Sequence, residues 1–141
     1  MEPPVAALYA GHTALQLAQG FIEEGLQVII FGPRDRLRLY SRFPTIRPRL
    51  VVFRGEETLD EIASEGGVII LTGGVVEYLT PRLVLNTRAP VFGLRGLVAW
   101  ESDWRLKMKL LEEAGLPVPR YFNSIDEVEG LVIAKLPGAK G

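Results

Sequence analysis

Short, continuous runs of apolar residues recur along the first 93 residues and constrain the fold more than any other feature. We expect strands at residues 5–10, 26–31, 50–53, 68–71 and 91–92. The runs do not alternate with polar residues, which is typical of strands that are buried on both faces. Strands of that kind form a parallel sheet with helices on each side. The sequence therefore predicts an α/β fold with a doubly wound, mostly parallel, Rossmann-like sheet.

Helical patterns separate these runs. We expect helices at residues 14–24 and 57–64, because apolar residues recur there at helical spacing and glycines follow. A longer helix is expected at residues 101–114, ended by Gly115. Ser124 is expected to cap a short helix at residues 125–128, and residues 131–136 are expected to form one more strand.

Composition excludes several classes of protein and site. A chain of 141 residues with 48% hydrophobic and 23% charged residues indicates one globular domain. The net charge of −1 predicts no nucleic-acid partner. The absence of cysteine excludes disulfides and thiolate ligands, and the single histidine, His12, argues against a histidine-based zinc site. No apolar run approaches the ~20 residues that span a membrane, and no signal peptide is recognisable, so we expect a cytoplasmic protein.

Gly11, His12 and Thr13 lie between the first expected strand and the first expected helix. Backbone N–H groups at a helix start can bind an anion, and a histidine there can donate to a phosphate or a purine-like ring. The alternative is that Thr13 caps the helix and His12 has no role. The segment is not a Gly-x-Gly-x-x-Gly motif, so it carries no dinucleotide fingerprint.

An arginine tract, residues 34–54, contains seven arginines and one acid and follows the second expected strand. The planar guanidinium suits phosphate, and the tract begins with Arg34 on the ligand side of a doubly wound sheet. The alternative is a solvated loop whose charges face water, and the sequence leaves both interpretations open. A nucleic-acid surface is less favoured, because aromatic residues do not interleave the charges.

Glycine-rich turns follow three later strands. Gly73 and Gly74 either permit close approach of a ligand or form a tight turn. Arg95, after the fifth strand, is expected to reach a ligand. Lys135 precedes a glycine-rich turn that contains Lys140, a weak pattern for binding nucleotide phosphates. No paired carboxylates and no nucleophile elbow are present, so the chain alone shows no complete catalytic site.

Several segments together resemble a known family, the archaeal formate-dependent ligases that formylate AICAR in purine synthesis (the PurP family). The similarity covers most of the chain. Its most specific parts are Trp100-Glu101-Ser102 with the helix that follows, and the final Lys-Leu-Pro-Gly-Ala turn. The shorter matches are Gly11-His12-Thr13, Arg34-Asp35, Tyr40, Arg42-Phe43, Phe92-Gly93 and Arg95.

The resemblance implies a pre-ATP-grasp substrate domain at residues 1–99, a connecting helix and linker at 100–119, and the first elements of an ATP-grasp domain at 120–141. It implies a ligase that joins formate to the amino group of AICAR ribonucleotide through formyl phosphate, using ATP and Mg²⁺. It assigns AICAR ribonucleotide to His12, and we expect Thr13, Arg34, Gly73, Gly74 and Arg95 to contribute to the same substrate site. It assigns ATP to Lys135 and Lys140, with the Mg²⁺ ligands beyond Gly141, and we also expect Lys109 at the ATP site.

Two turns depart from the family pattern. Thr72-Gly73-Gly74 replaces a His-Gly-Ser turn whose serine contacts AICAR, and Gly93-Leu94-Arg95-Gly96 replaces Gly-Asn-Arg-Arg. Three hypotheses follow. The chain is the N-terminal part of such a ligase, or a stand-alone binding or interaction module derived from one and lacking catalysis, or part of a ligase for another small acid or amine. A homo-oligomer is possible in each case.

Overall fold

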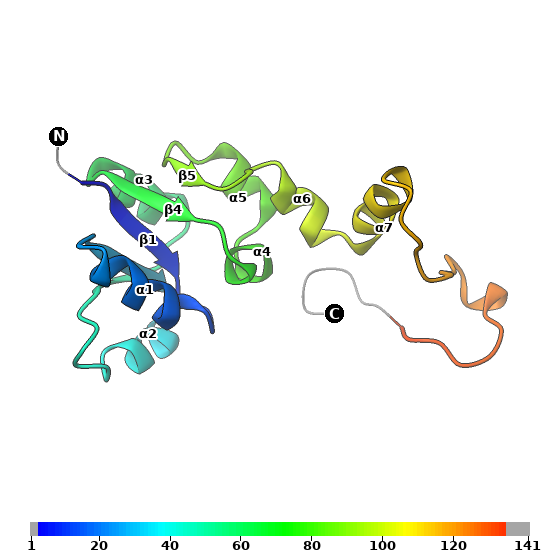
Figure 1. The fold of residues 1–141 in the computed structure, drawn as a ribbon, viewed down its shortest axis with the longest axis horizontal. Coiled ribbons are helices and arrows are strands. Elements are labelled where there is room, and N and C mark those ends of the chain that lie inside the picture. Colours follow the sequence, from blue (N-terminus) through cyan, green and yellow to red (C-terminus); the bar gives the residue numbers. More distant parts are fainter. Residues whose placement is uncertain (1–2, 135–141) are drawn as a thin grey trace.

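The computed structural model describes residues 3–134, and a five-stranded parallel sheet forms its centre (Figure 1). The strands are β1 (Val5–Tyr9), β2 (Val28–Gly32), β3 (Arg49–Val52), β4 (Gly67–Ile70) and β5 (Val91–Phe92). They lie in the order β3-β2-β1-β4-β5, and each neighbouring pair is parallel. The predicted doubly wound α/β fold is confirmed, and the five expected strands are displaced by at most two residues at their ends.

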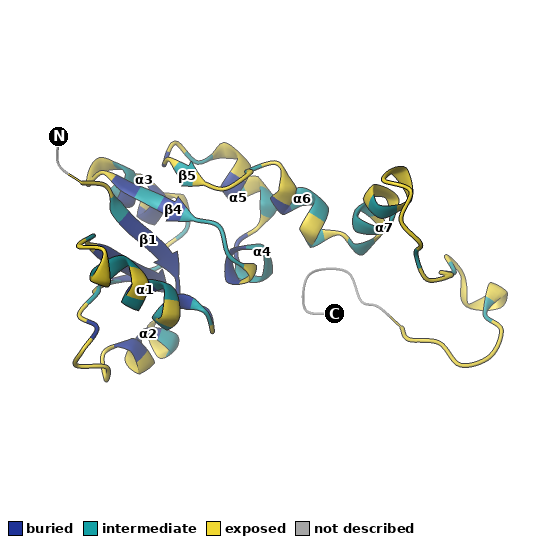
Figure 2. Cartoon of the chain, in the orientation of Figure 1, coloured by how far each residue is buried: buried dark blue, intermediate teal, exposed yellow. Residues whose placement is uncertain are grey.

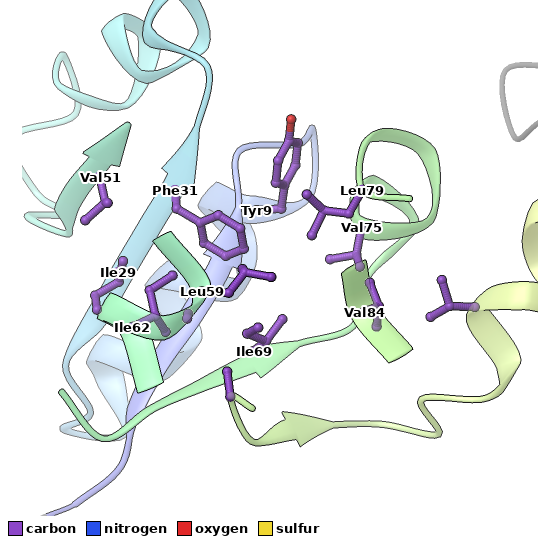
Figure 3. Close-up of a cluster of buried hydrophobic side chains, with 13 residues drawn as sticks. Tyr9, Ile29, Phe31, Val51, Leu59, Ile62, Ile69, Val75, Leu79 and Val84 are labelled. Carbon is purple, nitrogen blue, oxygen red and sulfur yellow. The ribbon is translucent and has the colours of Figure 1, made fainter. Parts of the chain in front are cut away.

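The two faces of the sheet bury separate apolar clusters, which explains why the strand sequences do not alternate. Successive residues of β1 point to opposite faces, so Leu8 belongs to one cluster and Tyr9 to the other. Their register partners on β2, Ile30 and Phe31, divide in the same way. Figure 3 shows the cluster that contains Phe31, packed between the sheet and the helices that follow β3 and β4.

Six helices contribute to these clusters, the sixth being α6 (Leu97–Ser102), whose Val98 packs in the cluster around Phe31. α1 (Ala14–Glu23) and α2 (Arg34–Tyr40) contribute to the cluster around Leu8. α3 (Glu56–Ser64), α4 (Gly73–Tyr78) and α5 (Pro81–Asn86) contribute to the cluster around Phe31. The helices at 14–24 and 57–64 were expected from the sequence. α2, α4 and α5 were not, because six or seven residues are too few to display a helical period. Over residues 3–134, no helix has both the length and the apolar character needed to cross a membrane.

The helix expected at residues 101–114 is confirmed over Trp104–Glu113, but its start is wrong. The structure contains α6 (Leu97–Ser102) and α7 (Trp104–Glu113), separated by Asp103 in an extended conformation (φ −121°, ψ 113°). The Asp103 carboxylate accepts a hydrogen bond from the backbone N–H of Arg105 at 2.8 Å. Aspartate is a preferred N-cap residue, and this cap begins a new helix within a continuous apolar pattern.

After α7 the described chain holds one short 3₁₀ helix, η1 (Ile125–Glu127). Ser124 caps it by accepting from the N–H of Asp126, so the expected cap is confirmed, although the helix is shorter than expected. The strand expected at residues 131–136 is wrong for residues 131–134, which form no strand, and the remaining two residues lie outside the described range. Leu131 is fully exposed and Ile133 is 85% exposed, so neither has the neighbouring strand that a buried strand needs. The domain boundaries at 99 and 119 stay a prediction.

Candidate functional site

The carboxyl ends of β1 and β4 adjoin at the point where the strand order reverses. From β1 the chain winds outward through β2 and β3, and it then returns to the other side of β1 to form β4 and β5. Open α/β sheets bind ligands outside the carboxyl ends of the strands at such a switch point. We call this region the crevice, and its turns are residues 10–13 after β1 and residues 72–74 after β4.

The two turns of the crevice touch through glycine. A Cβ added to Gly11 would lie 3.4 Å from Cα of Gly74, and one added to Gly74 would lie 3.5 Å from Cα of Gly11. The close approach at position 74 is therefore made by the backbone of the neighbouring turn, at Gly11. From the sequence, close approach of a ligand is one of two interpretations of Gly74. Gly73 has open space around its Cβ position and is exposed at the start of α4. The two predicted substrate segments, around His12 and around Gly73, are thus brought together.

His12 is exposed directly after the buried Gly11. Thr13 precedes α1 in a helical conformation and its side chain makes no capping hydrogen bond, so the interpretation of Thr13 as a side-chain cap is wrong. The first turn of α1 contains no acidic residue. The N–H groups at the start of this ten-residue helix therefore give the crevice a positive dipole end beside His12.

A cation and two aromatic rings border the crevice. Cζ of Arg36 on α2 lies 3.7 Å from the ring centroid of Tyr78 on α4, and its Nη1 donates to the Ala10 carbonyl at 3.3 Å. The Tyr78 ring stacks on Tyr9 with centroids 5.6 Å apart and planes 16° apart. Figure 3 shows the Tyr9 hydroxyl directed away from the apolar cluster. A hydrogen bond with Tyr78 raises the pKa of Arg36, so this guanidinium stays charged.

Tyr40, at the end of α2, contacts the same edge of the sheet from within the core. Its buried hydroxyl donates to the Gly11 carbonyl at 2.6 Å. Burial raises the pKa of Tyr40 above its ordinary value, and burial does the same for Tyr9. Both phenols are therefore neutral near pH 7, and the Tyr40 O–H is a permanent donor.

The arginine tract divides into groups with different surroundings. Arg34, Arg38 and Arg42 are exposed. Arg49 forms ion pairs with Glu61 and Glu65, and Arg54 with Glu57 and Glu61. The described contacts place Arg36 at the crevice, a residue that the sequence indicated only as one member of the arginine tract. Arg36 and Tyr40 are four residues apart and share one face of a helix, so recognising α2 would have revealed the pair.

The guanidinium of Arg95 is engaged within the fold. Nη1 donates to the carbonyls of Thr87 at 2.7 Å and Leu85 at 3.3 Å, and Nη2 donates to the Ala89 carbonyl at 3.0 Å. Arg95 thereby holds the connection between α5 and β5 against the turn after β5. Its predicted contact with a ligand stays a prediction.

The predicted ATP residues lie away from the crevice or outside the described range. Lys109 is exposed on α7, where Nζ lies 3.7 Å from Oε1 of Glu113. Lys135 and Lys140 fall outside the described residues. Within residues 3–134, no three His, Cys, Asp or Glu side chains gather in a way that could hold a metal ion. The placement of the Mg²⁺ ligands beyond Gly141 stays a prediction.

Known proteins resemble this chain in both sequence and fold. The 5-formaminoimidazole-4-carboxamide-1-(beta)-D-ribofuranosyl 5'-monophosphate synthetase of Ignicoccus hospitalis is 38% identical, over 96% of this chain and 41% of that protein. The IMP biosynthesis protein PurP from Thermococcus kodakaraensis superposes with a TM-score of 0.64 at 29% identity, covering 79% of this chain and 37% of that one. The resemblance indicated by the sequence motifs is confirmed.

A more distant structure shares the fold alone. The N5-carboxyaminoimidazole synthase of Aspergillus clavatus, solved in complex with ADP and 5-aminoimidazole ribonucleotide, superposes with a TM-score of 0.61 at 12% identity, over 83% of this chain and 31% of that one. The chain spans about two-fifths of the length of the curated relatives that it matches. The family described as "Protein of unknown function (DUF1246)" matches residues 6–122, most of the sequence, and the chain belongs to this family.

Proposed function

We propose that this chain is the substrate-binding, N-terminal part of an ATP-dependent ligase that formylates AICAR ribonucleotide with formate in IMP biosynthesis. The observation that carries the proposal is the 38% identity to a 5-formaminoimidazole-4-carboxamide ribonucleotide synthetase over 96% of the chain. Because the chain spans about two-fifths of such relatives, formyl transfer belongs to the whole protein, and substrate binding to this part. The expected location is the cytoplasm.

The crevice supplies the groups that an aminoimidazole nucleotide needs. Arg36 places a permanent positive charge near the carboxyl end of β1, and the start of α1 adds a positive dipole end. His12 is exposed in the same turn and can donate to the phosphate or to the ring. Each hydrogen bond to a charged group would contribute about 1.5–3 kcal/mol. Thr13, Gly73 and Gly74 would line the same ligand, and Arg34 would lie near its phosphate.

ATP is proposed as the second substrate of the whole protein, with Lys135, Lys140 and Lys109 contributing from this chain. The Aspergillus clavatus synthase, which shares the fold, was solved with ADP, and this supports a nucleotide site in proteins of this architecture. Mg²⁺ is implied by the family. The described residues gather no ligand set that fits it, so no step of the reaction is assigned to a metal held by this part of the chain.

A second candidate function is a binding or interaction module without catalysis. The sequence of the turns favours it, because Gly74 stands where the family has a substrate-contacting serine and Leu94 stands where it has an asparagine. The same departures also fit a ligase for another small acid or amine. Formylation of AICAR ribonucleotide by the full-length protein, measured with formate and ATP, would contradict both alternatives.

Isothermal titration of the chain with AICAR ribonucleotide tests the proposal, with AMP as the control ligand. We expect AICAR ribonucleotide to bind more tightly than AMP. His12→Ala should weaken binding about tenfold or more, since a hydrogen bond to a charged group is lost. Gln16→Ala, at an exposed position on α1, is the matched control and should leave the affinity unchanged. Equal binding of AICAR ribonucleotide and AMP by the full-length protein would contradict the proposed substrate.

A further inference from the structure

Two side chains of α2 hold the backbone of the turn that carries His12. The Tyr40 hydroxyl donates to the Gly11 carbonyl at 2.6 Å, and Nη1 of Arg36 donates to the Ala10 carbonyl at 3.3 Å. These two carbonyls belong to consecutive peptide groups immediately before His12. A helix that follows β2 thus fixes the turn that follows β1, across 29 residues of sequence in the case of Tyr40.

Two buried side chains fix the position of α2 against the core. Leu37 and Tyr40 are 5% and 4% exposed, and they pack in the same cluster as Ala10 and Ala14 at either end of the turn. Arg36 and Tyr40, one helical turn apart, both reach the turn after β1. The burial of α2 therefore determines where the two donors lie.

The Gly11 carbonyl is held from two sides. It accepts from the Tyr40 hydroxyl and from the backbone N–H of Ala14 at 3.1 Å, which uses both acceptor positions of the oxygen. This carbonyl shares a planar peptide group with the N–H of His12. Fixing the oxygen therefore fixes the direction in which the chain enters His12. Gly11 lacks a Cβ, and without such a contact its backbone would have more conformational freedom than any other residue type.

We propose that Tyr40 is a positioning residue for His12: its hydroxyl fixes the peptide plane between Gly11 and His12 and so directs His12 toward the crevice, while Arg36 holds the preceding peptide. The role of Tyr40 in binding AICAR ribonucleotide rests on the proposed function. Its effect on the backbone of His12 does not, and the two parts can be tested separately.

The ligand-free test compares Tyr40→Phe with the wild-type full chain by ¹⁵N relaxation. We expect the amide order parameter of His12 to fall from about 0.85, the rigid value, to below about 0.7, while that of Ile30 in β2 stays unchanged. Tyr121→Phe, at an exposed tyrosine beyond α7, is the matched control and should change neither value. An unchanged order parameter at His12 would overturn the proposal. If Tyr40→Phe does not fold, Arg36→Gln, which leaves the buried cluster intact, tests by the same measurement whether donors on α2 fix this turn, and an unchanged order parameter at His12 would then overturn the proposal.

The ligand-bound test is a double-mutant cycle measured by calorimetry with AICAR ribonucleotide. Tyr40→Phe should weaken binding about tenfold, because His12 loses its fixed orientation. In the His12→Ala background the same substitution should have no further effect, since Tyr40 acts through His12. Independent, multiplying losses would overturn the positioning role. Failure of the wild type to bind AICAR ribonucleotide would contradict the proposed function, and the relaxation measurement would still decide the role of Tyr40.

Discussion

The sheet and the segment that follows it differ in how they are held together. All buried residues of the described chain lie between Ala6 and Val98, and no described residue from position 99 onward is buried (Figure 2). α7 contributes nothing to the core, and Leu110 on this helix is 41% exposed. Apolar burial stabilises by roughly 25 cal/mol per Å², so the stability of the described chain resides in the sheet and its helices.

The contacts within the two regions also differ, since those of the second region lie on the surface. Ring and ion-pair contacts on the surface connect residues 99–134 to one another, such as Trp104 against Tyr121 at 5.6 Å and Lys107 with Glu101 at 2.7 Å. Exposed ion pairs contribute at most about 1 kcal/mol each. Interior packing therefore holds the sheet region, whereas surface contacts hold α7 and the residues after it up to position 134. This difference predicts that matched substitutions in the two regions have unequal effects on stability.

The largest effect is expected from Phe31→Ala in β2. Phe31 is fully buried between Tyr9 and Phe53, and its truncation should lower the free energy of unfolding by about 3–5 kcal/mol through lost burial and a cavity. Leu110→Ala on α7 is the matched control and should cost less than about 1 kcal/mol. Urea denaturation followed by circular dichroism measures both. Comparable losses at the two positions would show that α7 is packed as tightly as the sheet.

A smaller loss of stability is expected from Gly67→Ala, at the start of β4, where this strand packs closely against α3. A Cβ on Gly67 would overlap Cγ2 of Ile62 and would lie 2.6 Å from the Ile62 carbonyl oxygen. Since that backbone cannot move without shifting α3, Gly67→Ala should lower the free energy of unfolding by about 1–3 kcal/mol. Gly20→Ala, in α1 with open space around its Cβ position, should instead raise it by about 0.5–1 kcal/mol. Thermal denaturation of both variants tests this, and a stable Gly67→Ala would contradict the close contact between β4 and α3.

The sequence predicted the sheet because burial on both faces leaves a local signal. Each strand around Leu8 and Ile30 is a continuous apolar run, and such a run is visible without knowledge of its neighbours. The short helices leave no comparable signal, since six residues make fewer than two turns. The break at Asp103 depends on one capping side chain, so periodicity alone began the expected helix at residue 101, inside α6, rather than at Trp104.

The candidate site was predictable only in part. His12 and Gly73 follow strands, and the rule that parallel strands end at one edge was enough to place them together. The contacts of Arg36 and Tyr40 were not predicted, because they depend on α2 returning to the turn after β1, a contact between distant parts of the sequence. The arginine tract showed where positive charge is concentrated. Its composition could not show that Arg49 and Arg54 are paired with glutamates of α3.

A substitution of Arg95 tests where the sheet region ends, because Arg95 lies between β5 and α6. Two competing roles can be assigned to this residue. The sequence predicts that it reaches a ligand, whereas its guanidinium donates to the carbonyls of Leu85, Thr87 and Ala89. If the fold uses these bonds, Arg95→Ala should lower the free energy of unfolding by about 1–3 kcal/mol, because carbonyls of the α5–β5 connection lose their donors. Arg88→Ala, at an exposed arginine in the same connection, is the control and should change stability by less than about 0.5 kcal/mol.

Urea denaturation and titration with AICAR ribonucleotide, performed on the same variants, separate the two roles of Arg95. A loss of affinity in Arg95→Ala with unchanged stability would mean that the arginine leaves these carbonyls for the ligand, and that the region after β5 takes part in binding.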